Sequence, residues 1–270
     1  MTTATRATTG TTASAFGSLL RDWRQRRRLT QLDLGLAADV SARHLSFLET
    51  GRSRPSREMV LHLSEELDVP LRARNEMMTA AGFAPAYSHH DLGDAEMDEV
   101  RASLQRILDG HSPYPAVLVD GMWNLLASNT AVGVLTELVD RSLLTGPTNI
   151  VRLALHPRGL ARHVVDLPEY AAHLVSRLRR QAERSATTGL RALLAEAVEH
   201  CHAQGLDASA QPRDRIVLPL RLRHPDAELT FFSTVAVLGA PLDVTLDEVC
   251  IESFFPGDAA TADYLRRRVG

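Results

Sequence analysis

Apolar residues recur at helical spacing through the first part of the chain. Phe16, Leu19, Leu20 and Trp23 follow the i, i+3, i+4, i+7 spacing of an amphipathic helix. Further segments of this kind start after Thr or Ser, which cap helix N-termini, and stop near Gly or Pro, which end helices. The pattern predicts an all-α domain over 16–82 with five short helices, at 16–27, after Thr30 through Leu36, from Ser41 to Gly51, from Ser56 to Pro70, and at 71–81.

The pattern changes after this domain. Residues 83–95 contain Pro, Gly and polar side chains, which predicts a linker, and 96–109 again has helical spacing. Strand-like runs follow at 115–120, 122–128, 214–224, 228–239 and 248–255, and helical stretches lie near 129–141, 148–155, 167–186, 188–204 and 259–268. Two strands, a helical insert and three strands predict an α+β domain over 96–270, built on one antiparallel sheet.

Charge is distributed unevenly between the two predicted domains. Residues 1–60 hold ten Arg against five acidic residues, a balance of +5, and since the whole chain carries −3 the remainder carries −8. A basic head on an acidic body favours a polyanionic partner for the head alone.

Other features of the composition exclude some classes of protein. The first 15 residues are Thr- and Ala-rich and lack the basic and apolar regions of a signal peptide, so we expect a flexible arm. No apolar run approaches 18 residues, which argues against a transmembrane helix. The chain has two cysteines, which argues against a disulfide framework and favours a reducing cytoplasm.

The segment from Thr30 to Ser56 has the features of a helix-turn-helix motif. Small residues such as Gly35 would let its two helices approach closely, and the helix starts capped by Thr30 and Ser41 leave backbone N–H groups where a phosphate can bind. The second helix would lie in the major groove of DNA, with the side chains of its N-terminal end reaching base edges.

This segment resembles the XRE family of phage-repressor-type regulators, whose DNA-binding head has a lambda-repressor-like fold. Gln31 and the run LSFLETGRSRPS match the family's pattern, whereas Asp39 stands where the family usually has glycine. The resemblance implies a homodimer on a pseudo-palindromic operator in double-stranded DNA. The expected DNA contacts are Gln31, Ser41, Ala42, Arg43, Phe47, Arg52 and Arg54, with Arg43 the best placed to bind guanine.

The second domain resembles the C-terminal ligand-binding domain of MmyB-like regulators, through residues 112–131, 148–160 and 241–263, and its strand order resembles a PAS-like sensor sheet. The family is often found in actinobacteria, and the resemblance implies a fatty-acid-like ligand and no other cofactor. Apolar residues of the sheet, together with polar residues of the family-like segments and helix 167–186, supply the candidate ligand contacts Trp123, Asn129, Asn149, His156, Arg177, Phe231 and Phe255. We expect Glu252 to face outward from its strand.

Two alternatives to a ligand-sensing regulator remain open. The second domain could have a filled core and serve only dimerisation or protein interaction. The chain could also be an enzyme with an appended DNA-binding head, but the sequence has no catalytic motif such as G-x-S-x-G, Walker A or H-E-x-x-H and no metal-binding pattern. If a ligand does control the head, we expect the linker 83–95 and helix 96–109 to couple the two domains.

Overall fold

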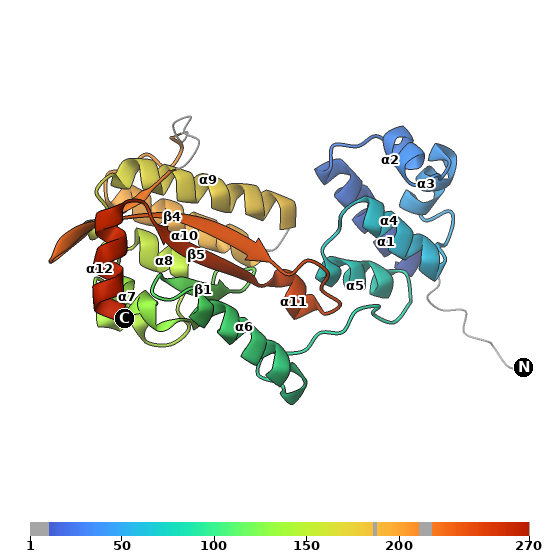
Figure 1. Cartoon of the computed structure of the whole chain (residues 1–270). Coiled ribbons are helices and arrows are strands. Elements are labelled where there is room, and N and C mark those ends of the chain that lie inside the picture. Colours follow the sequence, from blue (N-terminus) through green and yellow to red (C-terminus); the bar gives the residue numbers. More distant parts are fainter. Residues whose placement is uncertain (1–10, 186–187, 211–217, 270) are drawn as a thin grey trace, which may run out of the picture. The chain divides into compact units, whose positions relative to one another are not determined.

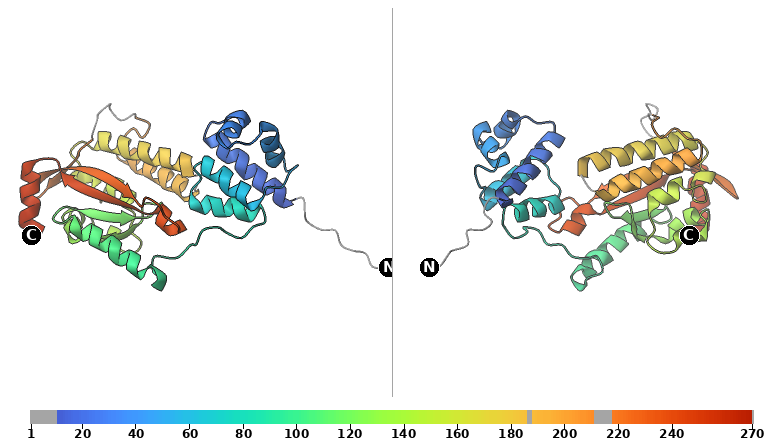
Figure 2. Two further views of the ribbon diagram at one scale, coloured as in Figure 1. Left: turned by 45° about the vertical axis from the view of Figure 1, so that its right-hand side comes forward. Right: turned by 180° about the vertical axis from the view of Figure 1, so that it is seen from behind.

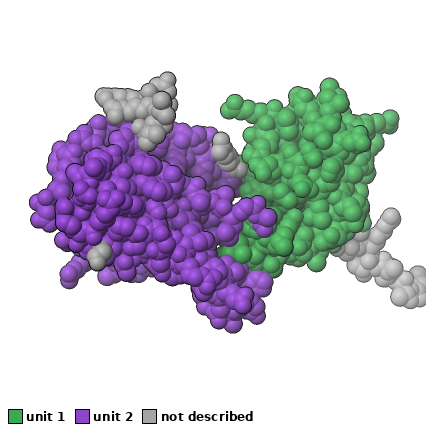
Figure 3. Space-filling view, in the orientation of Figure 1, with its two compact units in different colours: residues 1–89, 241–247 green, residues 90–240, 248–270 purple. Residues whose placement is uncertain are grey.

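The computed structural model describes residues 11–185, 188–210 and 218–269. The chain divides into two compact units: unit 1 is residues 1–89 with 241–247, and unit 2 is residues 90–240 with 248–270 (Figure 3). Of the arm predicted over 1–15, residues 1–10 lie outside the described part, and the first helix already begins at Thr11. Residues 83–89 of the predicted linker belong to unit 1, where the Asn75 side chain binds the backbone of Ala86 and Tyr87.

Unit 1 contains the five predicted helices, which the structure confirms (Figure 1). Their bounds are α1 Thr11–Arg26, α2 Gln31–Ala37, α3 Ala42–Glu49, α4 Arg57–Glu66 and α5 Leu71–Ala80. The side chains of Thr30, Ser41 and Ser56 each accept a hydrogen bond from an N–H in the first turn of α2, α3 and α4. These caps satisfy backbone donors that a helix start leaves unpaired. The helices enclose one core, which includes Phe16, Leu20, Leu34, Leu45, Leu63 and Met77.

The turn between α2 and α3 uses a left-handed residue. Asp39 has φ of 52°, and the next residue, Val40, donates its N–H to the carbonyl of Gly35 at 2.9 Å. This is the hydrogen bond that closes a helix with a left-handed C′ residue, a position that Asp tolerates better than most residues. A Cβ on Gly35 would lie 2.5 Å from the carbonyl oxygen of Val40, so the tight turn requires glycine there.

Helices α1, α2 and α3 meet at one buried carboxylate. Glu49, in the last turn of α3, receives hydrogen bonds from Arg24 of α1 at 2.6 and 2.9 Å and from Gln31 of α2 at 2.8 Å. The Glu49 side chain is only 3% exposed. At Gly17, α1 approaches α3 so closely that a Cβ would lie 2.5 Å from the carbonyl oxygens of Leu48 and Glu49. These contacts fix the position of α3 on α1.

Unit 2 is built on a five-stranded antiparallel sheet, as predicted. The strands are β1 Ala116–Val119, β2 Leu125–Ser128, β3 Leu220–His224, β4 Ala227–Val237 and β5 Cys250–Pro256, in the order β2-β1-β5-β4-β3. Residues 214–217 of the predicted third strand lie outside the described residues. The first and last strands of the sequence are therefore neighbours, which brings residues from both ends of the domain together at the centre of the sheet.

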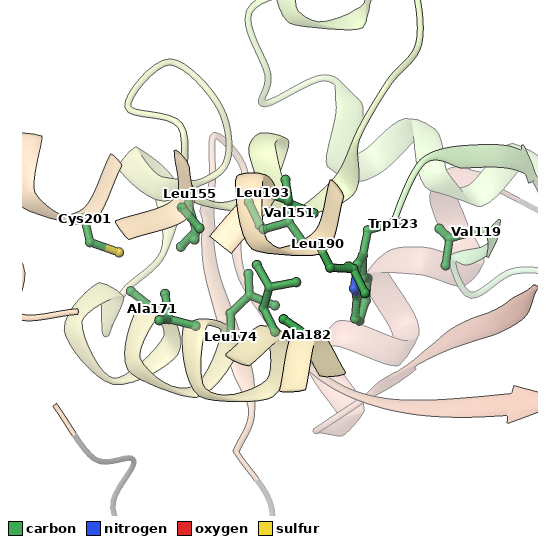
Figure 4. Close-up of a cluster of buried hydrophobic side chains, with 14 of the residues drawn as sticks. Val119, Trp123, Val151, Leu155, Ala171, Leu174, Ala182, Leu190, Leu193 and Cys201 are labelled. Carbon is green, nitrogen blue, oxygen red and sulfur yellow. The ribbon is translucent and has the colours of Figure 1, made fainter. Parts of the chain in front are cut away.

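Helices cover both faces of this sheet (Figures 1 and 2). On one face, α8 Ile150–Leu155, α9 Leu167–Ser185 and α10 Thr188–Ala203 pack with the sheet in a core that includes Val119, Trp123, Leu174 and Leu193 (Figure 4). On the other face, α6 Asp98–Gly110 places Leu104 and Leu108 against Ala116, Leu118 and Ile251.

Shorter elements complete unit 2. They are the 3-10 turns η1 Ala95–Met97, η2 Thr130–Val132, η3 Arg141–Leu144 and η4 Ala161–His163, and the helices α7 Gly133–Thr136 and α12 Ala259–Val269; α11 Val244–Glu248 begins in unit 1. The helical stretch predicted near 129–141 is found as the consecutive short elements η2 and α7 over 130–136 and does not continue to 141 as one helix. Within the described ranges, no helix is long and apolar enough to cross a membrane.

The carboxylate network gives a prediction for stability. Burial alone would raise the pKa of Glu49, but the hydrogen bonds from Arg24 and Gln31 and the nearby positive charge hold that pKa below its ordinary value of 4.5. A depressed folded-state pKa stabilises the fold above pH 4.5, and this contribution is lost as the pH falls through the folded-state value. Glu49→Gln leaves Arg24 buried without its charge partner, so we expect a loss of roughly 3–5 kcal/mol at neutral pH.

Urea unfolding of the full chain, followed by the fluorescence of Trp23 in a Trp123→Phe background, measures this effect. The difference in unfolding free energy between the wild type and Glu49→Gln should narrow as the pH falls below 4.5 and through the lower folded-state pKa of Glu49. Glu66→Ala, an exposed carboxylate of α4, serves as the control and should change stability little. A gap that stays constant with pH would show that the charge of Glu49 is unimportant.

Candidate DNA-binding surface and ligand cavity

Helix α3 is buried on one side and carries an exposed arginine, Arg43, on another. Leu45 and Leu48 are fully buried in the core of unit 1, whereas Arg43 is exposed in the first turn. The Arg43 guanidinium lies over the ring of Phe47, with 5.4 Å between its Cζ and the ring centroid. This stacking orders a long side chain while its five N–H donors remain directed outward, and such a fork can bind guanine or phosphate.

The structure places the other predicted DNA contacts on or beside the same motif. Ala42 begins α3 and is half-buried, and the Ser41 hydroxyl accepts the N–H of His44 at 3.2 Å. Gln31 uses one amide hydrogen on Glu49. Arg52 and Arg54 are exposed in the turn that follows α3.

Two apolar side chains of α2 are exposed. Leu32 is 61% exposed and Leu36 is 76% exposed, while Leu34 is fully buried. Alternate residues of a helix point in different directions, so Leu32, Leu34 and Leu36 do not share one face. Within the described part of unit 1, the exposed arginines are Arg21, Arg26, Arg28, Arg43, Arg52, Arg54, Arg57 and Arg72.

Unit 2 contains a cavity of about 130 Å³ between the sheet and its helical cover. All five strands contribute to its wall, and α7, α8 and α9 contribute from the other side. Most lining side chains are apolar, among them Val117, Leu125, Leu135, Val151, Leu174, Leu220, Phe231 and Phe254. Polar groups enter only at a few positions of the wall, which is the usual arrangement of a small-molecule site.

A buried ion pair lies in this wall. Nη1 of Arg177, on α9, is 3.3 Å from Oε1 of Glu252 on β5, and the Ser233 hydroxyl of β4 donates to the same oxygen at 2.8 Å. The Glu252 side chain is 8% exposed and that of Arg177 is 28% exposed. The Arg177 guanidinium also stacks on Trp123, with Cζ 4.3 Å from the ring centroid. Trp123 is held in turn by its Nε1–H, which donates to Gln181 at 2.6 Å.

Two titratable neighbours remain neutral at physiological pH. Burial lowers the pKa of His173, and the positive charges of Arg177 and Arg180 lower it further. Burial raises the pKa of Tyr170, and the Glu252 carboxylate raises it as well, so its hydroxyl stays protonated. The cavity wall therefore offers one cation, one anion and several neutral hydrogen-bonding groups.

Three of the predicted ligand contacts line the cavity, namely Trp123, Arg177 and Phe231. Asn129 does not, because its amide binds the backbone of Leu108, Tyr114 and Ala116 and ties β1 to the preceding turn. Its polar atoms are used for structure.

Asn149, His156 and Phe255 are also excluded from the cavity wall. Asn149 caps α8 and donates to the carbonyl of Met122. The His156 ring packs edge-to-face with that of His200, 5.1 Å between centroids, and burial lowers its pKa. Phe255 stacks on Phe232 on the opposite face of the sheet.

The sequence reasoning missed the polar wall. Glu252 was expected to face outward and instead points into the cavity, since β5 alternates Cys250, Glu252 and Phe254 on that side. Four residues of α9, Tyr170, His173, Leu174 and Arg177, also line it, and of these only Arg177 was predicted. Their spacing of i, i+3, i+4, i+7 on α9 is a signal that could have identified them as one face.

A metal site is not found within the part of the chain that the structure describes, where no group of three or more His, Cys, Asp or Glu residues could hold an ion. The adjacent residues His200, Cys201 and His202 of α10 point in different directions, and Cys201 is buried in the core.

Comparison with known proteins identifies both units. The model described as the MmyB-like transcription regulator ligand binding domain matches residues 100–267, and a helix-turn-helix model matches residues 20–73. The crystal structure of the clp gene regulator ClgR from Corynebacterium glutamicum is similar at 24% identity, over 38% of this chain and 95% of that chain, with a TM-score of 0.24. No curated protein matches the chain. The first match covers more than half of the sequence, and the chain therefore belongs to the MmyB-like transcription regulators, with an XRE-type helix-turn-helix for DNA binding and a ligand-binding domain.

Proposed function

We propose that this regulator binds a pseudo-palindromic operator as a homodimer and that a fatty-acid-like molecule in the cavity of unit 2 controls its affinity for DNA. The observation that carries the ligand part is the cavity itself, an apolar chamber with one buried ion pair in its wall. The helix-turn-helix of unit 1 supplies the output.

The lining favours a ligand with an apolar body and one polar end. An engineered cavity of roughly 150 Å³ with apolar walls binds benzene. The cavity of unit 2, at about 130 Å³, is of similar volume and is large enough for an apolar group. A carboxylate head group would bind the donors of Arg177 that Glu252 leaves unused, since the two side chains make a single contact at 3.3 Å. Decanoic acid, which has an apolar chain and a carboxylate head group, serves as the probe.

The cavity also bears on the alternative in which unit 2 is only a dimerisation or interaction module. Such a module needs no hollow, whereas this wall buries a charged pair beside open space. Native mass spectrometry of the purified protein distinguishes the two, because a co-purifying lipid supports a ligand site and a protein that never retains lipid favours a module.

The DNA-binding surface gives a prediction for Arg43. Arg43→Ala should reduce discrimination between the operator and unrelated DNA by roughly 1–3 kcal/mol if Arg43 binds a base bidentately. Selection from random duplexes first supplies the operator, which should be an inverted repeat if a homodimer binds. Fluorescence anisotropy then measures the affinity of each variant for the operator and for a scrambled duplex at several salt concentrations.

Arg43→Lys is the matched control, because it keeps the charge but loses the planar fork. It should retain affinity for scrambled DNA and lose discrimination. If Arg43→Ala instead weakens both duplexes equally and lowers the salt dependence, Arg43 contacts a phosphate and the base-reading role is wrong.

The ion pair gives a prediction for the ligand. Glu252→Gln removes the anion beside Arg177 and should tighten binding of decanoic acid about tenfold. The double variant Arg177→Gln/Glu252→Gln removes both charges without leaving one buried alone, and it should bind the acid on the order of ten- to a hundredfold more weakly than Glu252→Gln does, which is the loss of a charged hydrogen bond worth ~1.5–3 kcal/mol. Isothermal titration calorimetry of the full chain measures these affinities.

Arg180→Gln, an exposed charge on the same helix that does not line the cavity, serves as the control and should leave the affinity unchanged. Decanol, which has the same chain and no charge, should respond little to the Arg177 substitution. Equal responses of acid and alcohol would show that the ligand's polar end does not bind Arg177.

A further inference from the structure

The connection between β4 and β5 belongs in part to the DNA-binding unit. Residues 241–247 lie in unit 1, although the chain on either side of them forms two strands of unit 2. The chain thus passes between the units three times, after residues 89, 240 and 247. The linker 83–95, which contains the first of these positions, is therefore one of several covalent connections between the two units.

Hydrogen bonds hold this segment at two points within unit 1. The N–H of Val244 donates to the carbonyl of Ser88 at 2.9 Å, and Ser88 and Asp243 form a parallel β-bridge. The carboxylate of Asp247 accepts the backbone N–H of Leu71 at 2.9 Å. Val244 is 1% exposed, so the segment is packed into unit 1 as well as bonded to it.

The bond from Asp247 compensates for a weakness of α5. The residue before α5 is Pro70, which makes no side-chain cap, and the first turn of α5 has no acidic residue. Asp247, 176 residues away in sequence, therefore supplies the carboxylate that a helix start favours, through a hydrogen bond and through the positive end of the helix dipole.

Helix α5 is connected to the recognition helix by packing. Its Met77 and Met78 are fully buried in the same core as Phe16 and Leu20 of α1. Helix α1 in turn meets α3 at Gly17 and through Arg24 and Glu49. A shift of the first turn of α5 would therefore displace α1, whose Arg24 holds α3 through Glu49.

The other ends of the same segment reach the cavity. Ser233 and Phe231 of β4 and Glu252 and Phe254 of β5 line its wall. These strands pair with each other in register, with Thr234 opposite Ser253 and Val237 opposite Cys250. A molecule that displaces this part of the wall displaces these two strands, and their connection carries Asp247.

We infer that the β4–β5 connection is the coupling element of this regulator and that Asp247 transmits the state of the cavity to α5 of the DNA-binding unit. The inference rests on the proposed function, because it concerns how the ligand of that cavity acts. Asp247 is a positioning residue that contacts neither ligand nor DNA.

A double-mutant cycle on the full chain tests the inference without any lipid. Ser233→Phe fills the cavity from β4, and we expect it to change affinity for the selected operator about fivefold or more, a typical size for coupling between sites. In an Asp247→Ala background the same substitution should change affinity by less than about twofold. Asp247→Asn, which keeps an acceptor for the Leu71 N–H, should retain most of the coupling. Hydrogen exchange of 71–80 should change with Ser233→Phe only when residue 247 can accept that bond.

The control is Asp207→Ala, which removes a carboxylate that accepts the N–H of Ser209 in a turn of unit 2 away from the cavity wall. It should leave the effect of Ser233→Phe intact. Additive effects of Ser233→Phe and Asp247→Ala on operator affinity, or no effect of Ser233→Phe at all, would overturn the inference.

Decanoic acid provides the arm that separates this inference from the proposed function. If the acid changes operator affinity equally in the wild type and Asp247→Ala, ligand control stands and Asp247 is not its route. The acid could instead bind the wild type without changing operator affinity, while the effects of Ser233→Phe and Asp247→Ala are non-additive. That result supports the coupling element and shows that the ligand is of another kind. If the acid changes operator affinity in the wild type but not in Asp247→Ala, the result supports both the coupling element and the proposed function.

Discussion

The buried carboxylate of Glu49 is the contact on which the geometry of the DNA-binding unit depends. It lies in the last turn of α3 and receives hydrogen bonds from α1 and α2, so a single group joins all three helices. A buried charge without partners costs several kcal/mol, which means that other arrangements of these helices are penalised. Arg43 is exposed at the opposite end of α3, so its place on the unit is fixed by this buried contact.

The ion pair of the cavity differs from this one in ways that suit another role. Arg24 and Glu49 make two hydrogen bonds at 2.6 and 2.9 Å, whereas Arg177 and Glu252 make one contact at 3.3 Å. The tighter pair uses both carboxylate oxygens internally. The looser pair leaves guanidinium donors of Arg177 toward the cavity and holds that side chain by stacking on Trp123 instead. A buried pair of this kind contributes little to stability, and its main effect is to make one part of the wall polar.

Local signals in the sequence were sufficient for the elements and insufficient for the cavity. Thr30, Ser41 and Ser56 cap their helices through bonds to residues three positions on, which a sequence displays directly. The orientation of Glu252 depends on Arg177, 75 residues away, and both alternating sets of β5 are partly apolar, so periodicity could not decide which set faces inward. Asn129 and Asn149 were candidate ligand contacts because they carry amides in the segments that resemble the family's ligand-binding domain, but backbone groups bind these amides here.

The contact of Asp247 with α5, next to the point where the chain returns to unit 2, could not be predicted from the sequence for a related reason. Nothing near Asp247 in the sequence indicates that its carboxylate caps a helix beginning at Leu71, since the need arises at Pro70, where α5 lacks a cap of its own. A ligand shifts an equilibrium only by binding two states of the protein with different affinity. A flexible linker between the units would transmit little of that difference, because it can accommodate many positions of the strands without strain. A short connection, held by β4 and β5 at its ends and by Ser88 and Leu71 at its middle, has far fewer conformations available. We therefore infer that such a connection transmits a movement of β4 and β5 to α5 better than a flexible linker does.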